Sequence, residues 1–194
     1  MRNFYDIMAR FYDCFVWGAE KRYGHEKSAI FSAAEGKTLL VGVGTGIDLK
    51  HMPPGLEITA IDLSSSMLKY ASKRAQKYDG KIELLQCNIE KTDFPDNCFD
   101  SVVTSCVFCS VSNPIQGLKE IHRILKPGGK LIMLEHVLSR NILLKPMLYM
   151  MNVMIPFGPE FTRNTIQNVK TAGFKVSSER NLILDIVKAV EATP

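Results

Sequence analysis

The run Leu39-Leu40-Val41-Gly42-Val43-Gly44-Thr45-Gly46 decides the fold of this chain. Three apolar residues typical of a buried strand are followed at once by glycine at every second position. Glycine leaves the backbone N–H groups uncovered, so a ligand can approach them closely. Parallel α/β sheets bind ligands beyond the carboxyl ends of their strands. The stretch therefore predicts the first strand of such a sheet, with a ligand site at its tip.

The same alternation of strand and helix continues along the chain. Further apolar runs predict strands near 58–61, 82–85, 99–104, 131–134, 174–178 and 184–190. Ser64 or Ser65 is placed to cap a helix after the second strand. Further helices are expected over 115–125, ending at Pro127-Gly128-Gly129, and over 162–172, ending at Gly173. We expect an α/β fold with a mostly parallel seven-stranded sheet and helices on both faces.

Length and composition limit the class of protein. The 194 residues suit one domain. The formal net charge is +4, but the lysines are scattered, so no nucleic-acid-binding surface is expected. Five cysteines without framework spacing predict reduced thiols in a cytoplasmic protein. The first twelve residues lack the apolar core of an export signal, and charged and proline residues interrupt 142–157, so a spanning helix is not expected there.

Polar residues follow the next two predicted strands. Asp62 ends the second strand, twenty residues after Gly42, where a carboxylate accepts hydrogen bonds from ribose hydroxyls. The alternative is a helix-capping aspartate. Asn88 ends the third strand, and its amide can both donate to and accept from an adenine edge. Because Ile47 replaces the last glycine of the dinucleotide fingerprint and no P-loop lysine follows, the pattern favours a nucleoside without a pyrophosphate.

These motifs resemble the class I S-adenosylmethionine-dependent methyltransferases over about residues 37–134. The resemblance rests on four blocks in order, which are Leu39–Gly46, Ala60-Ile61-Asp62-Leu63-Ser64, Phe94-Pro95-Asp96-Asn97-Cys98-Phe99-Asp100 and Arg123-Ile124-Leu125-Lys126-Pro127-Gly128-Gly129. It implies a Rossmann-like methyltransferase fold with S-adenosyl-L-methionine as cofactor. The residues that it places against the cofactor are Tyr12, Gly42, Val43, Gly44, Gly46, Asp62, Leu63, Met67, Asn88, Ile89 and Ser105. Two positions depart from the family: Leu40 and Asn88 stand where an acid is frequent.

The resemblance implies one methyltransferase domain over 1–194. We divide it into an N-terminal helical cap at 1–36, a cofactor-binding core at 37–135, a substrate lid at 136–160, and a C-terminal helix and strands at 161–194.

The N-terminal segment predicts an amphipathic helix. Its aromatic and methionine residues recur at steps of three and four, at Phe4, Tyr5, Met8, Phe11, Tyr12 and Phe15. Residues 5–13, 107–111 and 135–137 are similar to a branch of the family with phospholipid N-methyltransferases, quinone-ring C-methyltransferases and thiol methyltransferase-like proteins. By this analogy Tyr12 is a catalytic residue that lines the cofactor pocket, with its ring near the sulfonium, and Tyr5 contacts substrate. The alternative is that both rings only pack on the domain.

Methyl transfer from a sulfonium needs alignment and exclusion of water rather than a metal. The four histidines are isolated from one another, so no metal site is expected, and neither a redox nor a zinc role is favoured for Cys106 and Cys109. His136, after the fifth strand, is the candidate catalytic base toward a substrate amine or hydroxyl. The alternative is a structural histidine.

The segment after His136 should decide the substrate. Met147, Met150, Met151 and Met154 form one helical stripe. They predict either a packed lid or a flexible apolar wall for a hydrophobic acceptor at the bilayer interface. In the second case Arg163, with Arg140 and Lys145, would meet lipid phosphates.

The sequence thus predicts an enzyme that methylates a hydrophobic or membrane-associated acceptor. The amine of a phospholipid such as phosphatidylethanolamine is the first choice, and quinone-ring carbon or a small thiol are alternatives. From another class, the chain would be a non-catalytic nucleoside-binding or lipid-interface module. The expected partners are a small-molecule or lipid substrate and, peripherally, the inner membrane face. The acceptor atom, the number of methyl groups and the oligomeric state stay open.

Overall fold

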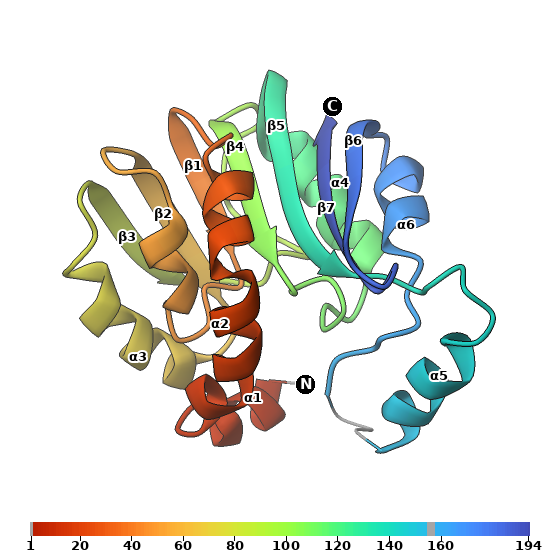
Figure 1. Ribbon diagram of the computed structural model, residues 1–194. Helices are drawn as coiled ribbons and strands as arrows, with labels where there is room; N and C mark the ends of the chain where they lie inside the picture. The colour runs from red at the N-terminus through yellow and green to blue at the C-terminus, as the bar shows by residue number, and fades with distance from the viewer. Residues whose placement is uncertain (1, 155–157) are drawn as a thin grey trace.

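One twisted sheet organises the chain in the computed structural model, which describes residues 2–154 and 158–194 (Figure 1). The sheet has seven strands in the order β3-β2-β1-β4-β5-β7-β6. Strands β1 to β5 are parallel, and β7 runs antiparallel to both of its neighbours. The strands are β1 (Lys37–Val41), β2 (Glu57–Asp62), β3 (Lys81–Gln86), β4 (Phe99–Ser105), β5 (Leu125–His136), β6 (Lys175–Ile183) and β7 (Val187–Thr193). The predicted fold class and its mostly parallel seven-stranded sheet are confirmed.

Helices cover both faces of the sheet. They are α1 (Arg2–Met8), α2 (Tyr12–Phe31), the 3-10 helix η1 (Ile47–His51), α3 (Ser65–Ala75), α4 (Pro114–Ile124), α5 (Lys145–Met154) and α6 (Thr165–Thr171). Because strand side chains alternate between faces, Leu39 and Val41 pack with α4 and α6, while Leu40 packs with α2 and α3. Both cores are built mainly from buried aliphatic and aromatic side chains. This packing fixes the carboxyl ends of β1, β2 and β4 at one edge.

The structure differs from the predicted elements at several places. Strand β5 begins at Leu125 rather than 131, so Pro127-Gly128-Gly129 lies within it; β6 extends to Ile183 rather than 178, and α6 is shorter than the predicted helix at 162–172. The N-terminal helix breaks after Met8 and resumes at Tyr12, so a cap of two helices replaces one. Strand β7 begins at Val187 rather than 184, because Leu184 and Asp185 adopt positive φ angles of 39° and 58° in the turn from β6. The side chains of Phe4 and Phe15, and residues 155–157 of the predicted lid, lie outside the described residues.

The cap and α5 lie at the same end of the molecule as the carboxyl ends of the strands (Figure 1). Helix α5 stands apart from the helices that cover the sheet, and Leu148 is its buried side chain. Within the described ranges, no helix combines the length and apolar character needed to cross a bilayer.

Candidate active site

A cavity of about 350 Å³ lies at the carboxyl ends of β1, β2 and β4. This volume is within the range of small-molecule pockets. Its walls come from the cap, the turns after β1, β2, β3 and β4, and the first turn of α3. The lining residues are Tyr5, Tyr12, Val41, Gly42, Gly44, Ile61, Asp62, Leu63, Ser64, Met67, Cys87, Asn88, Ile89, Glu90, Ser105, Cys106, Val107, Ser110, Val111 and Ser112.

The glycine turn after β1 depends on the absence of side chains. Gly42 has a φ of 65°, and a Cβ atom there would lie 2.6 Å from a methyl carbon of Val107. Gly44 also has a positive φ, of 55°, and its N–H donates to Asp62 Oδ2 at 2.8 Å. Larger residues would strain the backbone and obstruct the turn. The turn is therefore bare backbone that faces the cavity.

Asp62 fixes two backbone segments at once. Its Oδ1 accepts the N–H of Ser64 at 2.9 Å, while Oδ2 accepts the N–H of Gly44. Burial raises the pKa of Asp62, although the backbone hydrogen bonds act against it. The cap of α3 is Ser64, whose hydroxyl accepts the N–H of Met67 at 3.1 Å, so the capping alternative for Asp62 is wrong. Each carboxylate oxygen retains a lone pair for a ligand.

Asn88 and Glu90 line the cavity after β3. The amide oxygen of Asn88 accepts the N–H of Glu90 at 3.0 Å, and Glu90 in turn accepts the N–H of Asn113 at 2.9 Å. These bonds shape the turn and hold both polar groups at the edge of the cavity.

Two tyrosines of the cap form the opposite wall. The rings of Tyr5 and Tyr12 meet edge to face, with 6.5 Å between their centres. The Tyr5 hydroxyl forms a 2.5 Å hydrogen bond with the hydroxyl of Ser110. Burial raises the pKa of Tyr5 to about 12 and raises that of Tyr12 as well. Both phenols therefore stay protonated at neutral pH and present aromatic surface rather than a base.

Polar contacts attach the cap to the turns that it covers. Asp13 accepts the hydroxyl of Thr45 at 2.6 Å and forms a 2.5 Å ion pair with Arg74. Asp6 accepts the hydroxyl of Ser64. The cap is thus tied to the glycine turn and to α3, so the two tyrosines are held over the cavity.

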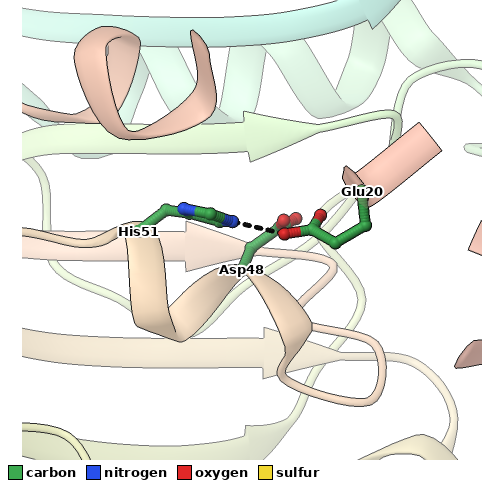
Figure 2. Close-up of side chains that lie close together, drawn as sticks. All are labelled: Glu20, Asp48 and His51. Atoms are coloured by element: carbon green, nitrogen blue, oxygen red, sulfur yellow. Dashed lines mark hydrogen bonds and ion pairs between the residues drawn. The ribbon is translucent and has the colours of Figure 1, made fainter. Parts of the chain in front are cut away.

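Further along α2, a network of charged side chains joins this helix to η1 (Figure 2). Glu20, Asp48 and His51 bring one possible metal-ligand atom each within 4.8 Å of the others. The ammonium of Lys27 lies 2.9 Å from Glu20 Oε2 and 2.6 Å from Asp48 Oδ1, and His51 Nε2 lies 2.5 Å from Glu20 Oε1. Burial alone would raise the pKa of Glu20, but hydrogen bonds from His51, Lys27 and Lys50 lower it to about 2. Because the ammonium groups of Lys27 and Lys50 already pair with the carboxylates, this network is an ion-pair anchor for α2.

His136 lies outside the lining of the cavity. It is the last residue of β5, its ring packs edge to face on Phe161 with 5.3 Å between centres, and its buried Nδ1 has no hydrogen-bond partner among the described residues. Burial lowers the pKa of His136, but interaction with Cys109 and Glu135 outweighs this and raises it. The structure therefore does not bring the predicted base to the cavity.

Arg163 is also placed differently from its prediction. Its guanidinium is largely buried and donates to the carbonyl oxygens of Phe108, at 2.8 Å, and Val111, while Nε pairs with Glu160 at 2.7 Å. These contacts occupy the side chain, so it supports the segment after β4 instead of facing lipid phosphates.

The methionine stripe faces outward. Met147, Met150 and Met154 are 40%, 57% and 72% exposed, so the packed-lid alternative is wrong for this face. Neither Met147 nor Met151 lines the cavity.

Two of the predicted cofactor residues lie outside the cavity lining. Val43 is buried in the core, and Gly46 closes its turn against Ala71. The remaining predicted cofactor residues, and Tyr5, do line the cavity.

Sequence reasoning missed much of the wall after β4. Residues 105–112, which we call the β4 loop, contribute Cys106, Val107, Ser110, Val111 and Ser112 besides the predicted Ser105. Cys106 has a φ of 54°, an uncommon conformation for a residue with a side chain. The similarity of 107–111 to related enzymes was the available signal, but it assigned no role to these residues.

The five cysteines are free thiols. Cys14 on α2 is exposed, Cys87, Cys98 and Cys106 are half-buried, and Cys109 is buried. Burial raises the pKa of the last four thiols, which therefore stay protonated at neutral pH.

Comparison with known proteins agrees with this geometry. Residues 39–133 match the family model described as a methyltransferase domain. The chain is 31% identical over 167 residues to the ubiquinone/menaquinone biosynthesis C-methyltransferase UbiE of Geotalea daltonii, a match that covers 82% of this chain and 70% of the relative. The chain therefore belongs to the S-adenosylmethionine-dependent methyltransferases. It is an enzyme that uses S-adenosyl-L-methionine, as predicted, rather than a non-catalytic module.

Other relatives differ in the acceptors that their names give. The thiol S-methyltransferase TMT1B of Rattus norvegicus is 33% identical over 147 residues, covering 71% of this chain and 59% of the relative. The phosphatidylethanolamine N-methyltransferase of Cereibacter sphaeroides is 32% identical over 111 residues, covering 56% and 55%. The chain thus spans little more than half of these two proteins. A solved S-adenosylmethionine-dependent methyltransferase of Thermotoga maritima has the same fold, with a TM-score of 0.75, 21% identity, and coverage of 100% of this chain and 99% of that one.

Proposed function

We propose that the cavity is the methyl-transfer site and that Asp62 holds the cofactor ribose. Asn88 would face the adenine edge, the bare backbone at Gly42 and Gly44 would admit the methionine part, and Tyr12 would face the sulfonium. The support is a carboxylate, an amide and an aromatic ring placed around uncovered backbone. When bound, the cofactor supplies a methyl group already activated by positive charge.

We further propose that the acceptor is the amine of a membrane phospholipid. The observation that carries this proposal is the charge of the lining: apart from Asp62, which we assign to the ribose, the charged side chain among the described lining residues is the carboxylate of Glu90. An acidic, aromatic wall favours an amine, which becomes cationic as it is methylated. The amine lone pair forms the N–C bond while the C–S bond electrons pass to sulfur, and the amine proton leaves to water.

The exposed apolar surface near the cavity supports a membrane-held acceptor. On and before α5 the exposed apolar residues are Ile142, Leu143, Met147, Tyr149, Met150, Val153 and Met154, and on the cap they are Ile7, Phe11 and Trp17. Within 140–154 the charged residues are Arg140 and Lys145, both basic. Apolar surface flanked by basic side chains suits an anionic bilayer interface. The lipid phosphate would stay outside the acidic cavity.

Quinone-ring carbon methylation is the second candidate. It is favoured by the match to the Geotalea C-methyltransferase, which covers more of this chain than the match to the phospholipid enzyme. It requires a base for the acidic ring hydroxyl. His136 lies outside the cavity lining, and Tyr5 and Tyr12 have raised pKa values. The described wall therefore fits an amine better.

A competition assay tests the acceptor. The protein is incubated with methyl-deuterated S-adenosylmethionine and vesicles of phosphatidylethanolamine and phosphatidylglycerol that also contain a reduced, unmethylated quinone, and a small thiol is added. Mass spectrometry should find deuterated methyl on the phospholipid amine. Label confined to the quinone or to the thiol would refute the phospholipid proposal and support the corresponding alternative.

A matched pair of variants tests the membrane contact. Val153→Glu introduces a charge into the α5 surface, whereas Tyr70→Glu introduces one on α3, outside both apolar surfaces. We expect Val153→Glu to weaken vesicle co-sedimentation and lipid methylation while Tyr70→Glu binds as the parent protein does. Equal binding by both variants would contradict the contact through α5.

A further inference from the structure

The β4 loop is held from beneath by one buried carboxylate. Glu135 on β5 is fully buried, and its Oε1 accepts the Thr104 hydroxyl at 2.8 Å and the Val107 N–H at 3.0 Å. Its Oε2 accepts the Phe108 N–H at 3.1 Å. All three donors belong to the end of β4 or to the loop that follows it. Glu135 itself does not line the cavity.

We propose that Glu135 is a positioning residue for methyl transfer, which holds the β4 loop in the shape that contacts the acceptor. The proposal rests on the cavity being the methyl-transfer site. The loop supplies Cys106, Val107 and Ser110 to the wall, and Ser110 bonds to Tyr5 of the cap. One carboxylate therefore determines how the acceptor side of the cavity meets the cap.

The backbone of the loop explains why it needs such support. Cys106 has a φ of 54°, which is unfavourable for a residue with a Cβ atom, and such conformations persist only where neighbouring contacts impose them. The adjacent Val107 N–H donates to Glu135, and the Cys106 N–H donates to the Leu134 carbonyl at 2.7 Å. A carboxylate accepting several backbone N–H groups provides strong, directional support.

The ionised form of Glu135 gives this support best. A proton on the carboxyl group removes the negative charge, so the hydrogen bonds that the Val107 and Phe108 N–H groups donate to it become weaker. Burial raises the pKa of Glu135 to about 7, despite its hydrogen bonds with Val107, Thr104 and Phe108 and the nearby His136. The neighbouring thiols of Cys106 and Cys109 have raised pKa values and stay neutral near pH 7. The loop should therefore loosen as the pH falls through about 7.

The amide signals of Val107 and Phe108 test this without any acceptor. In nitrogen-15-labelled protein, both signals should titrate with a midpoint near pH 7. Thr104→Val removes a donor that favours the ionised carboxylate, so it should move the midpoint to higher pH while the fold is kept. Glu135→Gln should abolish the titration. The proposal would be overturned if the two amide signals titrated in Glu135→Gln as they do in the parent protein. It would also be overturned if they did not shift in the parent protein between pH 5.5 and 8.5.

Kinetics then separate positioning from general damage. With whichever acceptor is methylated, Glu135→Gln should raise the acceptor KM about tenfold, as expected for loss of a hydrogen bond to a charged group, and leave cofactor affinity within about twofold. Asp100→Asn is the matched control, because Asp100 also accepts a backbone N–H but lies at the opposite end of β4. Parallel loss of acceptor and cofactor binding in Glu135→Gln would contradict the proposal. If that variant does not fold, the midpoint of Thr104→Val decides the question.

Discussion

Replacing Asp62 by alanine tests the geometry of the cofactor site most directly. The carboxylate accepts N–H groups from Gly44 at 2.8 Å and Ser64 at 2.9 Å, and we propose that it also accepts ribose hydroxyls. Hydrogen bonds to a charged group contribute about 1.5–3 kcal/mol each. Loss of the ribose contact should weaken S-adenosylmethionine binding by roughly 1–3 kcal/mol, or about 5- to 150-fold.

Isothermal titration at pH 8 measures this change, and thermal melts show whether the variant is folded. Asp62→Asn keeps the side-chain volume and should give an intermediate loss, because one amide oxygen remains as an acceptor. Glu57→Ala, at the other end of β2, removes an exposed carboxylate and should bind as the parent does. An Asp62→Ala variant that is folded and binds the cofactor with unchanged affinity would refute the ribose assignment.

Three further changes have expected outcomes. Gly42→Ala should abolish cofactor binding. Gly55 also has a positive φ, but no atom lies within 4 Å of an added Cβ, so Gly55→Ala should only lower the free energy of unfolding by about 1–3 kcal/mol. Calorimetric titration of the cofactor and thermal melts compare the two variants. Arg163→Met should destabilise the fold by about 1–3 kcal/mol in denaturant unfolding, because two loop carbonyls lose their donor, and an unchanged free energy of unfolding would contradict this role. The pKa of Glu20 is lowered to about 2 from its ordinary value of 4.5, so the ionised carboxylate stabilises the fold above pH 4.5. This contribution to the free energy of unfolding disappears as the pH falls through about 2. The melting temperatures of the parent protein and Glu20→Gln should therefore differ at pH 6 and converge toward pH 2, and a constant difference would disprove the linkage.

The cofactor side of the cavity could be predicted from the sequence because it depends on local pattern. Strand ends determine where Gly42, Asp62 and Asn88 lie, and parallel strands bring such ends to one edge. Strands β1 to β4 also lie within one or two residues of their predicted ranges. For β1, β2 and β4 the reason is that continuous apolar runs mark strands buried on both faces.

The acceptor side could not be predicted because it depends on tertiary contacts. Glu135 and Val107 are 28 residues apart, and nothing in either local pattern indicates their hydrogen bond. Helical spacing correctly groups the methionines of α5 on one face, but periodicity does not say whether a face is buried. His136 does end a strand at the expected edge, yet it packs on Phe161 instead of reaching the cavity.

The uneven exposure of the cysteines offers a way to watch the cap directly. Cys14 is the exposed thiol, and the thiolate rather than the thiol reacts with alkylating reagents. The other four side chains are shielded in part or fully, and their raised pKa values make them slow to alkylate. A maleimide dye should therefore attach selectively to α2, without any engineered residue. Its fluorescence would then report whether α2 changes its surroundings as cofactor and acceptor are added in turn.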